Sequence, residues 1–175
     1  MNEKKPLRVL GIDPGLAKMG WGVIEVDGPG FSLIEYGSLS TSTDLCHSER
    51  LLAVHLEVKR VVTEFQPDVA AIEEIFCGKN PRTALVTGEA RAASILACSL
   101  AGLRVVELAA TVVKLGVTGN GHASKEQVQA MVQRILKLAE PPRPADAADA
   151  LAVAIVQAQR NRRRITVSPS GTGGS

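Results

Sequence analysis

The stretch VLGIDPG, from Val9 to Gly15, decides the fold. Its apolar residues lie on both faces of an extended chain, as a strand inside a covered sheet requires. Pro14 and Gly15 form a strong turn signal, so Asp13 is expected at the end of this strand. A carboxylate there is costly to bury unless it meets a metal, a hydrogen-bond donor or water. The plainer interpretation is an Asp that starts a turn, unless other carboxylates converge on it.

Strands and helices alternate along the rest of the chain. Further strands are expected at 20–26, 31–39, 69–76 and 103–108, and helices at 51–65, 82–101 and 110–115. A glycine-rich loop at 116–122 precedes a helix opened by a capping box of Ser124 and Gln127. A last helix begins near Ala145 and ends at Arg160. This order predicts an α/β fold with a mixed five-stranded sheet, an antiparallel meander plus parallel strands, and helices on both faces.

Length and composition favour one domain. The 175 residues are enough for a single full core, which is assigned to residues 1–160. Residues 161–175 begin with a basic run and continue into a Gly/Ser-rich tail that is expected to be disordered. The three cysteines lie far apart without a CxxC pair, which favours reduced thiols in a cytoplasmic protein. The charged N-terminus predicts no signal peptide, and no apolar run approaches the ~20 residues that cross a membrane.

Carboxylates stand at three of the expected element ends. These are Asp13, the adjacent Glu73 and Glu74, and Asp146 with Asp149. The last pair is three residues apart on a helix, so both side chains point to the same face. Capping of the helix start and catalysis explain that pair equally well. Glu73 and Glu74 point to opposite faces of their strand, and their apolar neighbours leave open which one faces a site.

The chemistry of such a cluster follows from its donor atoms. Carboxylates with few His and no paired Cys suit hard cations, chiefly Mg²⁺ or Mn²⁺. Two such ions ~3.5–4 Å apart can activate a water and stabilise the leaving oxygen in phosphodiester hydrolysis. This chemistry needs no protein nucleophile, but it needs carboxylates from separate elements at one point.

Three motifs carry a resemblance to a known family. In order, VLGIDPG followed by GWG, AIEEIF followed by GKN, and DAADALAVA resemble the RuvC family of Holliday junction resolvases, from about Leu7 to Gln159. The resemblance implies a ribonuclease H-like fold and a homodimer. It implies a crossover junction endodeoxyribonuclease that makes paired, metal-dependent nicks in opposing strands of four-way junction DNA during recombination and repair. It also implies two Mg²⁺ per subunit, with Mn²⁺ as the alternative, and a RuvA–RuvB branch-migration complex as partner.

The same resemblance implies roles for the acidic residues. Asp13, Glu73, Asp146 and Asp149 match the metal-binding catalytic acids of the family. The family's essential Glu directly follows an Ala-Ile pair, which selects Glu73. Glu74 departs from the family pattern, because other members often carry a non-acidic residue there. Some members have His in place of Asp146, whereas here the site is all carboxylate.

Residues for DNA contact are expected around the site. Phe76 either packs in the core, the commoner fate of a strand Phe, or stacks on a base at an opened junction centre. The resemblance favours stacking. It also matches two lysines to positions near the scissile phosphate, although by sequence alone they are ordinary solvated lysines. The side chains predicted to contact DNA phosphates are Lys79, Asn80, Arg82, Lys114 and Lys125.

The predicted helix at 82–101 is dense in small residues, namely Ala84, Gly88, Ala92, Ala93 and Ala97. Small side chains let another element approach closely, either the helix's own sheet or the same helix of a second subunit. The subunit interface is slightly favoured, because a homodimer would present two equivalent sites to two equivalent strands.

Two other functions are compatible with parts of the sequence. Asp-x-Gly after a first strand also opens actin-like ATPases and sugar kinases, but those enzymes need two such domains, and 175 residues are too few. Stabilisation by a nucleotide would favour that alternative. A non-catalytic junction-binding scaffold is the other, and retention of all four acids argues against it.

Overall fold

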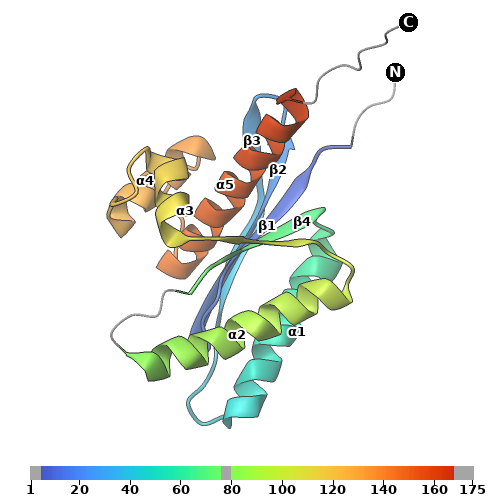
Figure 1. The fold of residues 1–175 in the computed structure, drawn as a ribbon, viewed down its shortest axis with the longest axis vertical. Coiled ribbons are helices and arrows are strands. Elements are labelled where there is room, and N and C mark those ends of the chain that lie inside the picture. Colours follow the sequence, from blue (N-terminus) through green and yellow to red (C-terminus); the bar gives the residue numbers. More distant parts are fainter. Residues whose placement is uncertain (1–4, 76–79, 168–175) are drawn as a thin grey trace, which may run out of the picture.

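The computed structural model describes residues 5–75 and 80–167. In these residues five strands form one sheet in the order β3-β2-β1-β4-β5 (Figure 1). The strands are β1 (Arg8–Asp13), β2 (Lys18–Asp27), β3 (Gly30–Ser40), β4 (Val69–Glu73) and β5 (Val105–Leu108). β1, β2 and β3 pair antiparallel, whereas β4 is parallel to both β1 and β5. The predicted mixed sheet, a meander followed by parallel strands, is confirmed.

Helices cover both faces of this sheet (Figure 1). The helices are α1 (His47–Phe65), α2 (Pro81–Leu100), α3 (Ala110–Thr118), α4 (Lys125–Ile135) and α5 (Ala145–Val167). α5 lies on one face with α3 and α4 outside it, and α1 and α2 lie side by side on the other. We call these the α5 face and the α1–α2 face.

Alternation along β1 divides the core in two. Val9 belongs to the cluster under α5, whereas Leu10 and Ile12 belong to the cluster under α1 and α2. All three side chains are fully buried. Because both faces are covered, β1 is apolar on both sides from Val9 to Ile12, just before it reaches Asp13.

α5 lies unusually close to the sheet, because two glycines face it. A Cβ atom on Gly11 of β1 would overlap the carbonyl oxygen of Ala150, and one on Gly20 of β2 would overlap that of Asp146. Main-chain atoms of the helix therefore pack directly on main-chain atoms of the strands. This contact fixes how deeply the first turns of α5 sit against the end of β1.

Two element ends differ from the expectation near the site. β4 ends at Glu73 rather than at Phe76. The Glu74 N–H still donates to the Leu108 carbonyl, at 2.9 Å, before the pairing with β5 stops. Phe76 itself lies outside the described residues. The strand therefore ends at the carboxylate, not at the aromatic residue.

The glycine-rich segment is partly helical, contrary to the expected loop at 116–122. α3 continues through Gly116 to Thr118, and the turn begins only at Gly119, which has a φ of 78°. A Cβ atom on Gly116 would lie 2.7 Å from the Val156 side chain, so this glycine lets α3 approach α5. Gly116 thus serves close packing between two helices and not a loop.

The last helix is longer than expected. α5 continues past Arg160 to Val167, so residues 161–167 are helical rather than part of a disordered tail. The sequence has neither Gly nor Pro between these two residues, which leaves the helix without a stop signal. Residues 168–175 lie outside the described part, and their disorder stays a prediction.

The start of α4 is as predicted. The Ser124 hydroxyl accepts from the Gln127 N–H at 3.3 Å, and the Gln127 side chain accepts from the Ser124 N–H at 2.9 Å. The capping box makes Lys125 the first residue of α4. Across residues 5–75 and 80–167, no helix has the length and apolar character needed to span a membrane.

Candidate active site

Two neighbouring parallel strands bring the first two acids together. β1 pairs with β4 in a register that sets Val9 beside Val69, and both of these residues face α5. The side-chain period of two then puts Asp13 and Glu73 on the same face, at the same edge of the sheet. Glu74, the next residue, is exposed and follows the end of β4. Strand pairing thus answers which glutamate points toward Asp13.

α5 brings the third acid into the same space. Asp149 lies one turn inside the helix and lines a cavity together with Asp13 and Glu73. Asp146, in the first turn, is half-buried and does not line that cavity. In the described part of the chain, neither aspartate side chain accepts a hydrogen bond from the helix's own amides. The capping alternative is therefore not realised for this pair.

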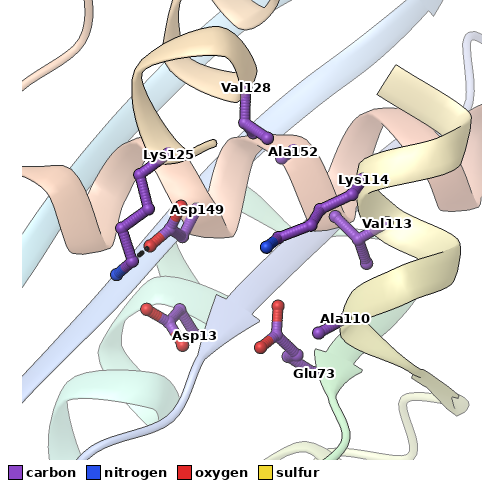
Figure 2. Close-up of a pocket in the computed structure, with 9 residues that line it drawn as sticks. All are labelled: Asp13, Glu73, Ala110, Val113, Lys114, Lys125, Val128, Asp149 and Ala152. Carbon is purple, nitrogen blue, oxygen red and sulfur yellow. Dashed lines mark hydrogen bonds and ion pairs between the residues drawn. The ribbon is translucent and has the colours of Figure 1, made fainter. Parts of the chain in front are cut away.

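The cavity is lined by acidic, basic and apolar residues. Its volume is about 210 Å³. Figure 2 shows Asp13, Glu73 and Asp149 converging on it from three different elements. The remaining lining residues are Ala110, Val113, Lys114, Lys125, Val128 and Ala152. The apolar part of this lining lowers the local dielectric, which strengthens every charge interaction inside.

Two lysines reach the carboxylates from the helices outside α5. The Lys125 ammonium, from the first residue of α4, donates to Asp149 Oδ2 at 3.2 Å. Lys114 of α3 extends toward the centre of the cavity from the opposite side (Figure 2). Both lysines predicted from the sequence are therefore beside the acids.

Burial and like charges change the protonation of Asp13. Burial first, and then the charges of Glu73, Asp149 and Asp146, raise the pKa of Asp13 to about 8, while Lys125 opposes the rise. Asp146 therefore acts on Asp13 electrostatically although it lies outside the cavity lining. Near neutral pH the metal-free site retains a proton that a solvent-exposed aspartate would have lost.

The same surroundings also shift the pKa values of Glu73 and Lys125. Burial, followed by the charge of Asp149, raises the pKa of Glu73, and Lys125 and Lys114 act against this rise. The charge of Asp149 and its hydrogen bond raise the pKa of Lys125. The site thus has more negative charge than its lysines neutralise, which favours an additional cation.

The donor set fits a hard divalent cation. Asp13, Glu73 and Asp149 offer carboxylate oxygens, the ligands that Mg²⁺ and Mn²⁺ prefer. Within residues 5–75 and 80–167, no three acidic, His or Cys side chains are already closed around one point as a metal site. The Lys125 ion pair accounts for part of this, because it turns one oxygen of Asp149 toward the ammonium.

Comparison with known proteins identifies the family. The family model described as crossover junction endodeoxyribonuclease RuvC matches residues 9–157, which is most of the chain. This chain belongs to the RuvC family. A curated crossover junction endodeoxyribonuclease RuvC from Chloroflexus aggregans is 49% identical over 152 residues, which cover 87% of this chain and 93% of that protein.

Solved RuvC structures share the fold of this RuvC-family chain. The structure of Thermus thermophilus RuvC superposes with a TM-score of 0.84 at 37% identity, covering 90% of this chain and 97% of that one. The same bacterium's RuvC in complex with a Holliday junction substrate gives a TM-score of 0.85 at 36% identity, covering 90% and 96%. The ribonuclease H-like fold expected for the family is therefore shown.

Among the other predicted DNA-contacting residues, Asn80 and Arg82 do not line the cavity that holds the acids. Phe76 and Lys79 lie outside the described residues. Asn80 caps α2, because its Oδ1 accepts from the backbone N–H groups of Arg82 and Thr83 at 3.1 and 3.3 Å. The Arg82 side chain is exposed and lines a different cavity. DNA contact by these residues stays a prediction.

Two cations near the site carry no sequence signal. Lys18 at the start of β2 and Arg50 on α1 line that second cavity together with Arg82. These residues are far apart in the sequence and belong to elements of different type. Only the fold brings them together, so no motif could have pointed to them.

Proposed function

We propose that this chain is a metal-dependent endonuclease that resolves four-way DNA junctions by nicking opposing strands during recombination and repair. The observation that carries the proposal is the convergence of Asp13, Glu73 and Asp149 in one cavity at the carboxyl edge of the sheet. Family membership supports it, and so does the solved complex of a related RuvC with a Holliday junction substrate.

The proposed cofactor is a pair of Mg²⁺ ions, or Mn²⁺ ions, in each subunit. Asp13, Glu73, Asp146 and Asp149 are the side chains that would hold them. When bound, such ions supply an activated water and stabilise the leaving oxygen of the phosphodiester. The raised pKa values of Asp13 and Glu73 support this assignment, because a cation favours the ionised carboxylates that burial and mutual repulsion disfavour.

The lysines complete the proposed chemistry. Lys114 approaches the cavity from the side opposite Lys125, in a position to hold a phosphate oxygen near the acids. Lys125 has to release Asp149 when that carboxylate turns to a metal ion, and its ammonium then becomes available to the same phosphate. The lysines thus neutralise substrate charge while the acids hold the cations.

Junction recognition rests on shape in this proposal. Phe76 stacks on a base at the opened junction centre, and Lys79, Asn80 and Arg82 contact backbone phosphates beside it. Phosphate contacts of this kind give affinity without sequence information. For Asn80 the contact has to come from groups that its capping role leaves available.

The functional unit is proposed to be a homodimer. α2 packs on its own sheet through Ala97 and Ala93, but it exposes Leu85, Leu96 and Leu100 on its outer side. Neighbouring α1 exposes Leu52 and Leu56. Exposed large apolar residues on two adjacent helices are typical of a surface that another protein covers. A two-fold dimer would present two equivalent sites to the two equivalent strands of a junction.

Action in the cytoplasm and cooperation with a RuvA–RuvB branch-migration complex are part of the same proposal. Both follow from the family and from the proposed substrate. A junction resolvase acts on DNA that a branch-migration machine has positioned, so the two activities would meet on one substrate.

The deciding experiment is incubation of the protein with a labelled four-way junction and Mg²⁺. We expect the wild type to make paired nicks. We expect Asp13→Asn to bind the junction without cutting it, because binding depends on cationic side chains and backbone groups. Equal cleavage by the two proteins would remove Asp13 from the site. Binding without any cleavage by the wild type, with either Mg²⁺ or Mn²⁺, would favour the non-catalytic scaffold.

A further inference from the structure

A second cavity lies beside the turn that leaves the catalytic strand. The turn from Gly15 to Lys18 forms one wall, Arg50 of α1 forms another, and the first turns of α2 form the third. Its volume is about 530 Å³, larger than that of the acidic cavity. Lys18, Arg50 and Arg82 line it together with Thr83 and Thr87, and its lining includes no carboxylate.

Lys18, Arg50 and Arg82 form no ion pair with any described residue. Elsewhere cations do pair, as Arg8 does with Glu25 and Lys125 with Asp149. Three like charges around one cavity repel one another, and an anion placed between them removes this repulsion.

One of these cations is held in place by the fold. The Arg50 Nε donates to Thr41 Oγ1 at 2.9 Å. Thr41 in turn is tied to the turn, because its hydroxyl donates to the Leu16 carbonyl and its N–H donates to the Ala17 carbonyl. The guanidinium is therefore positioned through Nε, while its terminal NH₂ groups have no partner among the described residues. A guanidinium presented in this way suits two oxygens of a phosphate.

We propose that this cavity binds a backbone phosphate of the junction DNA other than the phosphate that is cut. The inference rests on the proposed function, and it extends the DNA surface to Lys18 and Arg50. Arg82 and the hydroxyls of Thr83 and Thr87 complete a set of donors that phosphate oxygens accept from. Such a contact fixes the position of a DNA arm and does not select its sequence.

The location suits the same DNA arm that enters the active site. Gly15 is two residues from Asp13, so their Cα atoms are at most about 7.6 Å apart. The two cavities therefore flank the end of β1, the acidic one on the α5 face and the second one on the α1–α2 face. DNA that passes this edge of the sheet can place one phosphate at the acids and another in the second cavity.

The first test measures junction binding in metal-free buffer from 50 to 200 mM salt. Lys18→Gln and Arg82→Gln are suitable because both side chains are exposed. Each lost phosphate contact reduces the slope of log K against log salt by about 0.9, which is about a 3.5-fold smaller loss of affinity over this range. Arg82→Lys should keep most of the slope. The matched control Lys59→Gln removes an exposed cation of α1 outside both cavities and should leave the slope unchanged.

The second test locates the phosphate. Single backbone phosphates near the cut are replaced by neutral methylphosphonates, and binding is measured for the wild type and for Lys18→Gln/Arg82→Gln. At one position the substitution should weaken wild-type binding severalfold and the double variant much less, because the contact is already lost. Full additivity at every position, with an unchanged salt slope, would overturn the inference while junction cleavage by the wild type still upheld the proposed function. A wild type that neither binds nor cuts junctions would overturn both.

Discussion

The two faces of the sheet are covered in different ways. On the α5 face, a helix rests with its main chain against glycines of β1 and β2. On the α1–α2 face, helices pack through side chains and leave leucines exposed to solvent. A face that positions catalytic groups has to hold them within a fraction of an ångström. A face that meets a partner has to keep apolar area uncovered. The difference in packing thus separates the proposed chemistry from the proposed assembly.

The largest expected effect contrasts two adjacent glutamates. Glu73 points to the α5 face and lines the cavity, whereas Glu74 is exposed beyond the end of β4. Glu73→Gln should lower junction cleavage by more than the roughly 10–100-fold that follows when a group supporting a metal ligand is changed. Glu74→Gln is the matched control and should cut at close to the wild-type rate. Measured nicking rates that fall equally in the two variants would contradict the assignment of the faces.

The next effect contrasts two glycines. Gly11→Ala places a methyl group on the main chain of α5 and should destabilise the protein by about 1–3 kcal/mol or more. Gly88→Ala, on α2, adds a methyl group that meets only Ile75 Cδ1, at 3.8 Å, among the described atoms outside its own stretch of helix, and it should stabilise the helix by up to about 1 kcal/mol. Urea unfolding measures both changes. If Gly11→Ala unfolded at the wild-type urea concentration, close packing of α5 would not be what fixes its position.

The acidic cavity should make stability depend on pH. The pKa of Asp13 rises from its ordinary value of 3.8 to about 8 on folding, so the folded protein holds a proton that the unfolded chain releases. The stability that this proton contributes is therefore fully present below about pH 4 and is lost as pH rises toward 8, by about 1.4 kcal/mol for each unit of the pKa rise. Asp13→Asn cannot titrate and should lose less stability over this range.

Melting temperatures in a chelator, from pH 4 to pH 8, measure this difference between the two proteins. Adding Mg²⁺ at pH 8 should raise the melting temperature of the wild type and change that of Asp13→Asn much less, since ligand binding stabilises the folded state by mass action. Parallel pH profiles for the two proteins would show that Asp13 ionises normally.

The smallest effect concerns the α1–α2 face. Ala92 is exposed on α2, so Ala92→Glu should leave folding intact and weaken the proposed dimer by at least tenfold, or about 1.4 kcal/mol. Sedimentation velocity measures the dissociation. Ala130→Glu, at an exposed position of α4, is the control and should leave the oligomeric state unchanged. A wild type that is monomeric at all concentrations would remove the basis for this prediction.

Much of the fold could be predicted because local patterns agree with it. The apolar run that ends at Asp13, the helical spacing of α1 and the capping box of α4 each specify an element without help from the rest of the chain. The continuation of α3 through Gly116 could not be predicted, because the reason for that glycine is Val156 on another helix.

The acidic site was only partly predictable for a similar reason. Alternation could not choose between Glu73 and Glu74, because β4 is buried on both faces, and the choice depends on its register with β1. Capping and catalysis remained equal for Asp146 and Asp149, because the depth of α5 is set by glycines on two other strands. Lys18 and Arg50 gave no pattern, since long-range contacts alone bring them together.

The contact of α5 with Gly11 and Gly20 has a consequence for how the sequence can vary. The spacing between the acids of α5 and those of the strands is set there by main-chain atoms, which have no rotamers to adjust. Exchanges among apolar side chains of similar volume elsewhere along α5 should leave the dimensions of the site unchanged. A single methyl group on either glycine should change them at once. In a survey of all single substitutions, Gly11 and Gly20 should tolerate fewer replacements than the apolar residues of α5 that pack around them.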